Sequence, residues 1–111
     1  MPMTPGERVR LRPEAGARLL LELEAGEPGH AQYLAWVLVA DGEHGYRARL
    51  DANGTVELSA SAESTAASAD AEDDLRMLAR LTARGASKRI ADGLSAWPAR
   101  VMRWRGAGRG G

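Results

Sequence analysis

An apolar segment from Tyr33 to Ala40 constrains the fold of this chain more than any other part of the sequence. Alternate residues of a strand point to opposite faces of a sheet, so Leu34, Trp36 and Leu38 would share one face. The residues between them are also apolar. A strand that is apolar on both faces needs cover on both faces of its sheet.

Alternating apolar and polar residues predict further strands around this one. They cover residues 8–12, 18–24, 46–51 and 55–59. Asn53 and Gly54 favour a tight hairpin between the last two, because both residues tolerate positive φ. We therefore expect a curved antiparallel β-meander of about five strands.

Helical spacing replaces this alternation after residue 68. Ser68 or Asp70 can cap a helix, and Leu75, Leu78 and Leu81 would form its apolar stripe.

A second, shorter helix is expected after Gly85, which we place in the left-handed conformation that ends many helices. Ser87 would cap this helix and Ile90 would face inward. The segment 99–105 fits strand spacing and helix spacing equally well, so its structure stays open.

The fold class predicted from these patterns is α+β, with the meander followed by two helices packed on one face. We expect a single domain over residues 1–105 and a flexible, glycine-rich tail over residues 106–111. The predicted core draws on both halves of the chain: Leu19, Leu21, Trp36, Val37, Leu38, Leu50, Val56, Leu58, Leu75, Leu78, Leu81 and Ile90.

Composition excludes several classes of protein. The chain contains no cysteine, which excludes disulfides, thiolate metal sites and thiol nucleophiles. Its N-terminus lacks the apolar segment of a secretion signal, and the apolar segment 33–40 is far shorter than the roughly 20 residues that span a bilayer. We therefore expect a cytoplasmic protein that does not bind membranes.

The net charge of zero conceals two oppositely charged halves. Residues 1–74 contain 14 Asp and Glu but 6 Arg, whereas residues 75–111 contain 9 Lys and Arg but one acid, Asp92. Such a split indicates either a charged partner or neutralisation where the two halves meet in the fold.

A basic stripe in the second half is the first candidate binding site. Arg76, Arg80, Arg84 and Lys88 recur at intervals of four, so at least the three arginines share a helix face. The stripe would suit phosphates or an acidic protein surface. The alternative is a solvated helix face that pairs with the chain's own acids.

Arginine and tryptophan near the C-terminus form the second candidate. The group consists of Trp97, Arg100, Arg103, Trp104, Arg105 and Arg109. Interleaved Trp and Arg can stack on bases and neutralise phosphates. The favoured alternative is that Trp97, Val101 and Trp104 pack on the sheet while the arginines extend into solvent, because the core has few other aromatic residues.

No metal site, cofactor or catalytic motif is predicted. His30 and His44 fall in turns at opposite ends of the strand 33–40, too far apart to share a metal ion. No nucleophile elbow, P-loop or dinucleotide-binding motif occurs. A catalytic pair of carboxylates, formed by Glu22 and Glu57 on different strands, is a further possibility that nothing in the sequence favours.

Two short helices can cover only one face of a five-stranded sheet. A second copy of the chain could cover the other face, with Tyr33, Trp36 and Leu38 at the interface, and closure within one protomer is the alternative.

The sequence thus predicts a non-catalytic binding module, homodimeric, whose cationic C-terminal half contacts a partner such as an acidic protein. A single-stranded nucleic-acid-binding protein is the second hypothesis. A small enzyme or ligand-binding half-barrel is the third.

Overall fold

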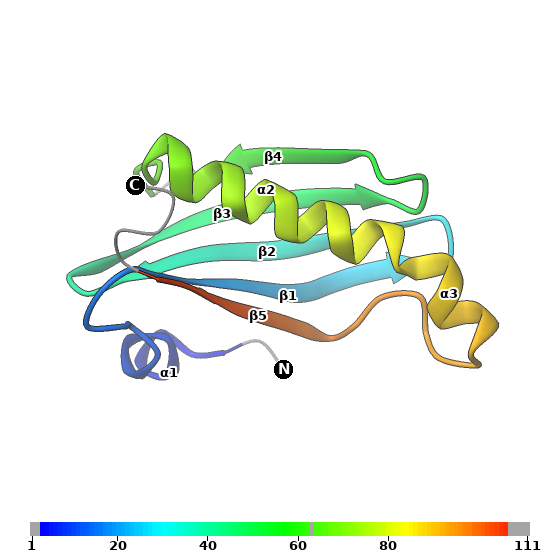
Figure 1. Ribbon diagram of the computed structural model, residues 1–111, viewed down its shortest axis with the longest axis horizontal. Helices are drawn as coiled ribbons and strands as arrows, with labels where there is room; N and C mark the ends of the chain where they lie inside the picture. The colour runs from blue at the N-terminus through cyan, green and yellow to red at the C-terminus, as the bar shows by residue number, and fades with distance from the viewer. Residues whose placement is uncertain (1–2, 63, 107–111) are drawn as a thin grey trace.

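Five antiparallel strands form one sheet in the order β4-β3-β2-β1-β5 (Figure 1). The computed structural model describes residues 3–62 and 64–106. The strands are β1 (Ala17–Glu27), β2 (His30–Val39), β3 (Gly42–Asp51), β4 (Val56–Ala60) and β5 (Arg100–Arg105). The helices are α1 (Pro5–Arg10), α2 (Ala69–Arg84) and α3 (Ala86–Ala91). The predicted α+β class with an antiparallel sheet and C-terminal helices is confirmed.

Consecutive hairpins connect β1 to β4, as the alternating patterns predicted. At the turn between β3 and β4, Gly54 has a φ of +97°, and the Asn53 side chain accepts a hydrogen bond of 2.9 Å from the Thr55 amide. The predicted hairpin is therefore confirmed. Strands β1, β2 and β3 are longer than expected, and β3 begins at Gly42, so His44 lies in a strand rather than in a turn.

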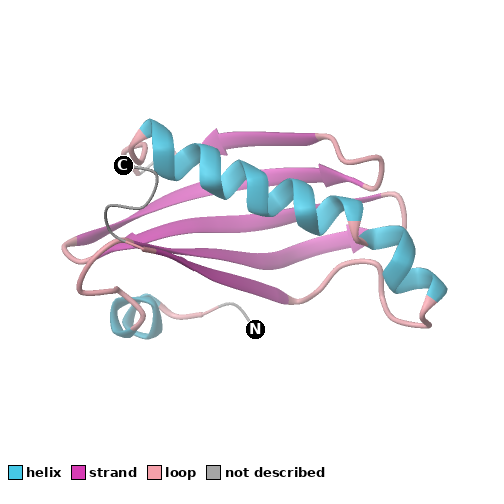
Figure 2. Cartoon of the chain, in the orientation of Figure 1, coloured by secondary structure: helices cyan, strands magenta, loops and turns pink. Residues whose placement is uncertain are grey.

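Helix α2 crosses one face of the sheet and forms the main core with it (Figure 2). The Ser68 hydroxyl accepts a hydrogen bond from the Ala71 amide and caps the helix, as predicted. The buried side of α2 packs on the inward side chains of β1, β2 and β3, among them the fully buried Tyr33.

Two residues of the C-terminal helices that were predicted to face the core do not face it. Leu81 and Ile90 are 44% and 49% exposed, while Ala79 and Ala83 are fully buried. At 3.6 residues per turn, Leu81 lies about 240° around the helix from Leu75, and the small alanines allow α2 to approach the sheet instead. The remaining predicted core residues are buried or half-buried.

The junction of the two helices also differs from the prediction. Gly85 is right-handed, with a φ of −78°, and α3 starts directly after it without a side-chain cap, so Ser87 does not cap. The chain bends there without a left-handed residue. The left-handed glycine stands after α3, at Gly93, with a φ of +80°.

The segment 8–12 does not form a strand, because a helix start precedes it. The Thr4 hydroxyl accepts a hydrogen bond from the Glu7 amide, the Glu7 carboxylate accepts one from the Thr4 amide, and Pro5 occupies the first turn. This capping box and the fixed φ of proline favour a helix. The alternation of apolar and basic residues over 8–12 therefore does not reflect a strand.

The fifth strand of the sheet comes instead from the other end of the chain. The segment 99–105, which fitted two structures equally well, forms β5 and pairs antiparallel with β1 over Ala17–Glu22. The number of strands was predicted correctly, but one of them was placed wrongly. Of the predicted tail, only Gly106 lies within the described residues.

Within those same residues, no helix has both the length and the apolar character needed to cross a membrane.

Candidate functional site at the edge of strand β5

Strand β5 lies at one end of the sheet, so among the described residues one of its edges has no neighbouring strand. The Leu23 amide donates a hydrogen bond of 2.9 Å to the Ala99 carbonyl, which sets the pairing pattern of β1 and β5. Hydrogen-bonded pairs alternate along an antiparallel ladder. The amide and carbonyl groups of Arg100, Met102 and Trp104 therefore point away from β1.

Trp97 fixes the chain just before β5. Its ring is 4% exposed and meets Tyr33 edge to face, with 6.5 Å between ring centroids. The Trp97 indole donates a hydrogen bond to the Glu27 carbonyl. A Cβ at Gly26 would lie 2.9 Å from the Trp97 ring, so glycine makes room for it. The expectation that Trp97 packs on the sheet is confirmed.

Trp104 does not share this role, because it is 58% exposed. It borders a small cavity of about 100 Å³ between β5 and α2, together with Leu19, Met77, Leu78 and Arg103. Met77 is also exposed, at 49%. The edge of the sheet and the adjacent side of α2 thus form one surface with both apolar and cationic side chains.

Several residues of the two basic groups have acidic partners. Arg76 pairs with Glu72 and Asp73 at 3.3 and 3.2 Å, and Lys88 pairs with Asp92 at 3.1 Å. In β5, Arg100 lies 3.6 Å from the buried Glu22, and Arg105 pairs with Asp74. The two halves of the chain therefore neutralise each other in part.

Three cations of the two groups remain without such a partner. Arg80, Arg84 and Arg103 are exposed and form no ion pair within 4.0 Å with any residue in 3–62 or 64–106. Arg80 and Arg84 follow each other by one helical turn on the solvent side of α2, and Arg103 lies on the edge strand. Arg109 lies outside the described residues.

The residues predicted for a dimer interface are covered by the chain itself. Tyr33 and Leu38 are fully buried, and the guanidinium of Arg8 stacks over the half-buried Trp36, 3.8 Å from its ring centroid. Tyr33 lies under α2, and its hydroxyl donates a hydrogen bond of 2.7 Å to the Pro98 carbonyl. Burial raises the pKa of Tyr33 above its usual value.

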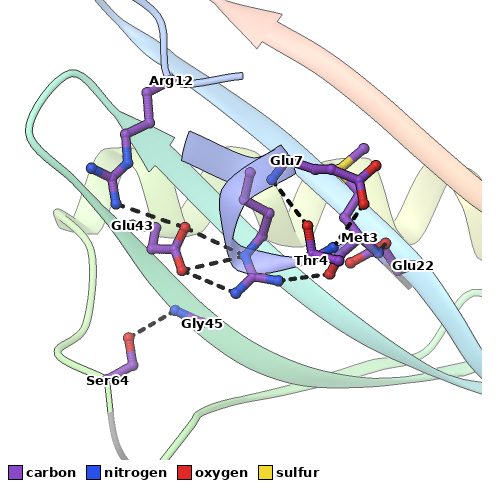
Figure 3. A network of polar contacts seen from close by, with 9 residues as sticks. Met3, Thr4, Glu7, Arg12, Glu22, Glu43, Gly45 and Ser64 are labelled. Atoms are coloured by element: carbon purple, nitrogen blue, oxygen red, sulfur yellow. Dashed lines mark hydrogen bonds and ion pairs between the residues drawn. The ribbon is translucent and has the colours of Figure 1, made fainter. Parts of the chain in front are cut away.

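A polar network holds α1 against the face of the sheet opposite α2 (Figure 3). Glu43 accepts hydrogen bonds from Arg8 at 3.2 to 3.4 Å and lies 3.9 Å from Arg12. The Met3 amide donates a hydrogen bond of 2.6 Å to Glu22. Sequence reasoning missed this network because it placed 8–12 in the sheet, although Thr4 and Glu7 carry the capping-box pattern.

A cavity of about 380 Å³ lies beside this network, lined in part by Arg8, Trp36 and Ser64. The edge of the Trp36 ring lies against the backbone of Gly45, where a Cβ would approach to 2.8 Å. The Gly45 amide donates a hydrogen bond of 2.8 Å to the Ser64 hydroxyl. The network therefore fixes both the aromatic ring and the loop after β4.

The other candidate groups are not brought together. His30 lies opposite Asp51 at one end of the β2–β3 ladder, and His44 lies opposite Val37 toward the other end, so the two histidines are far apart. In residues 3–62 and 64–106, no three acidic or histidine side chains could hold a metal ion. Glu22 in β1 and Glu57 in β4 are separated by two strands, so they cannot act as an acid pair.

Comparison with protein-family models, with curated protein sequences and with solved structures finds no match for this chain.

Proposed function

We propose that this protein is a non-catalytic binding module that uses its cationic C-terminal half to bind an acidic partner protein. The observation that carries the proposal is the presence of three exposed arginines, Arg80, Arg84 and Arg103, that have no carboxylate partner among the described residues. Arg103 also adjoins the exposed apolar side chains of Met77 and Trp104. Interfaces are enriched in Arg, Met and Trp relative to other surfaces.

The sequence-based expectation of a homodimer stays a prediction. Its premise was that the two C-terminal helices could cover only one face of the sheet. Helix α1 covers part of the other face, so a dimer through that other face would have to use half-buried residues such as Leu34 rather than Tyr33 or Leu38.

The test measures binding of fluorescein-labelled poly-L-glutamate by anisotropy. The double variant Arg80→Glu/Arg84→Glu should abolish binding without unfolding the protein, because exposed charges contribute little to stability. The matched control is Arg47→Glu/Arg49→Glu in β3, which changes the net charge equally. These two residues are also exposed and form only surface pairs with Glu24 and Asp51. Equal loss of binding in both variants, or no binding to wild type at about 50 mM salt, would refute the proposal.

Nucleic-acid binding remains the second candidate, since the exposed Trp104 stands beside Arg103 in β5. An oligothymidylate titration on the same three proteins separates the two. Counterion release would give a log–log salt slope of about −0.7 per phosphate contacted. A steep slope with oligothymidylate, lost in the α2 variant, together with weaker binding of poly-L-glutamate, would favour nucleic acid.

A further inference from the structure

We propose that the outer edge of β5 accepts an extended segment of the partner protein as a sixth strand, and that this segment alternates acidic and apolar residues. The inference rests on the proposed function and specifies how and what the cationic half binds. It starts from the unpaired backbone groups of Arg100, Met102 and Trp104. An exposed strand edge is a template for strand addition.

The side chains of β5 alternate between two rows, and from Met102 to Arg105 one row is apolar and the other is basic. Arg103 and Arg105 stand on the side of α2, since they pair in register with the buried Leu19 and Ala17. Met102 and Trp104 alternate with them and are 40% and 58% exposed. Residues directly opposite each other on neighbouring strands determine the pairing preference. An added strand would therefore carry acidic residues opposite Arg103 and Arg105 and apolar residues opposite Met102 and Trp104.

The cavity between β5 and α2 lies where a side chain of such a strand would reach. Its volume is about 100 Å³, and its walls combine Asp74, Met77 and Leu78 of α2 with residues of β5. Asp74 is paired with Arg105 of β5, so Arg103 is the cation of the wall that is left for a ligand. A glutamate fits this chemistry, because its methylene groups would contact the two apolar residues and its carboxylate would meet Arg103. Arg103 has no other carboxylate within 4.0 Å in the described part of the chain.

A second copy of this chain is a poorer occupant of the same edge. Antiparallel pairing joins outward-pointing residues of the two strands, and the register centred on Arg103 would place Arg103 directly opposite Arg103 of a second copy. Like charges directly opposite each other destabilise a strand pair. The same arginines would instead attract an acidic segment, so the charge of β5 selects between the two occupants.

The other edge of the sheet serves as an internal control. The amide of Asp51 donates a hydrogen bond of 2.9 Å to the Thr55 carbonyl, so the amides of Val56 and Leu58 point outward from β4. Strand β4 carries Glu57 and no basic residue. An acidic segment should therefore leave these two amides unchanged.

The experiment follows amide hydrogen exchange by NMR while wild-type protein is titrated with the acetylated, amidated heptapeptide EVEVEVE. At a peptide concentration ten times Kd, exchange at Met102 and Trp104 should slow about tenfold, and exchange at Val56 and Leu58 should not change. The control peptide has N-methylated valines. It keeps the charge but lacks the N–H groups that would donate to the Met102 and Trp104 carbonyls, so it should give no protection.

Charge reversal gives an independent readout. Arg103→Glu should weaken binding of EVEVEVE about fivefold, the upper range for an exposed ion pair, and should strengthen binding of KVKVKVK. Arg47→Glu is the control and should change neither.

The outcomes that overturn the inference differ from those that overturn the proposed function. Binding of EVEVEVE and of poly-L-glutamate without protection of Met102 and Trp104 would refute strand addition alone. Protection of the two amides that grows with protein concentration in the absence of peptide would identify a second copy as the occupant and would also refute it. Absence of any binding to either acidic probe would refute both.

Discussion

Replacing Leu75 and Leu81 by alanine, one at a time, tests the orientation of α2 with matched chemistry. Both residues belong to the same helix, but Leu75 is fully buried and Leu81 is 44% exposed. Loss of a buried leucine side chain removes its transfer free energy and leaves a cavity, which together cost about 2–5 kcal/mol. An exposed substitution stays within about 0.5 kcal/mol.

The difference is large enough to read from melting temperatures. For 111 residues, an unfolding entropy of about 2.1 cal/mol/K per residue converts a loss of about 3 kcal/mol into a Tm decrease of roughly 13 °C. Leu81→Ala should lower Tm by at most about 2 °C on the same scale. Thermal unfolding followed by far-UV circular dichroism gives both values. If the two variants melt together, or if Leu81→Ala is the less stable, α2 does not face the sheet as described.

Three further predictions concern other parts of the fold. Burial raises the pKa of Tyr33, so the folded state keeps a proton that the unfolded state loses, and stability should fall above about pH 10 by up to about 1.4 kcal/mol per pH unit. Urea unfolding should show that Tyr33→Phe costs about 1 kcal/mol at pH 7 through the lost hydrogen bond to Pro98 but flattens the alkaline decline. An unchanged alkaline slope would mean that another group titrates. Gly45→Ala should destabilise by about 1–3 kcal/mol because its Cβ would meet the Trp36 ring at 2.8 Å, and the near-UV circular dichroism of that ring should change. Light scattering at micromolar concentration tests the predicted homodimer, which a mass of 11.8 kDa would contradict.

Local patterns predicted those strands and turns whose neighbours in space are also neighbours in sequence. The hairpin at Asn53 and Gly54 and the helix cap at Ser68 involve only residues close along the chain. The conformation of the segment 99–105 could not be predicted from local patterns, because it depends on pairing with β1, which is far away in sequence.

The misplaced N-terminal strand has a different cause. The capping signal of Thr4 and Glu7 was present in the sequence, but the alternation of Arg8 to Arg12 was given more weight. The stacking of Arg8 on Trp36 could not have been predicted, because it joins α1 to β2 through tertiary packing alone.

The candidate site was predicted by residue type but not by geometry. Arg103 and Trp104 were singled out as binding residues, while their position on an edge strand depends on the order of the sheet. Helical spacing indicated that Glu72 could pair with the basic stripe, and Arg76 does pair with it, but the sequence could not show which acids lie next to the arginines of β5. Arg105 meets Asp74 only because β5 runs beside α2.

The pairing of β5 with β1 has a consequence for the order of events during synthesis. Strand β1 is made early and contains the fully buried Leu20 and Leu21, yet its outer edge finds a partner only after β5 has been translated. Pairing of segments so distant in sequence is slow, because the loop between them must close first. Until then the nascent chain exposes an unpaired apolar edge of the kind that chaperones bind and that aggregates. The arrival of β5 replaces that edge with one that carries Arg100, Arg103 and Arg105, and charged side chains on an edge strand disfavour aggregation.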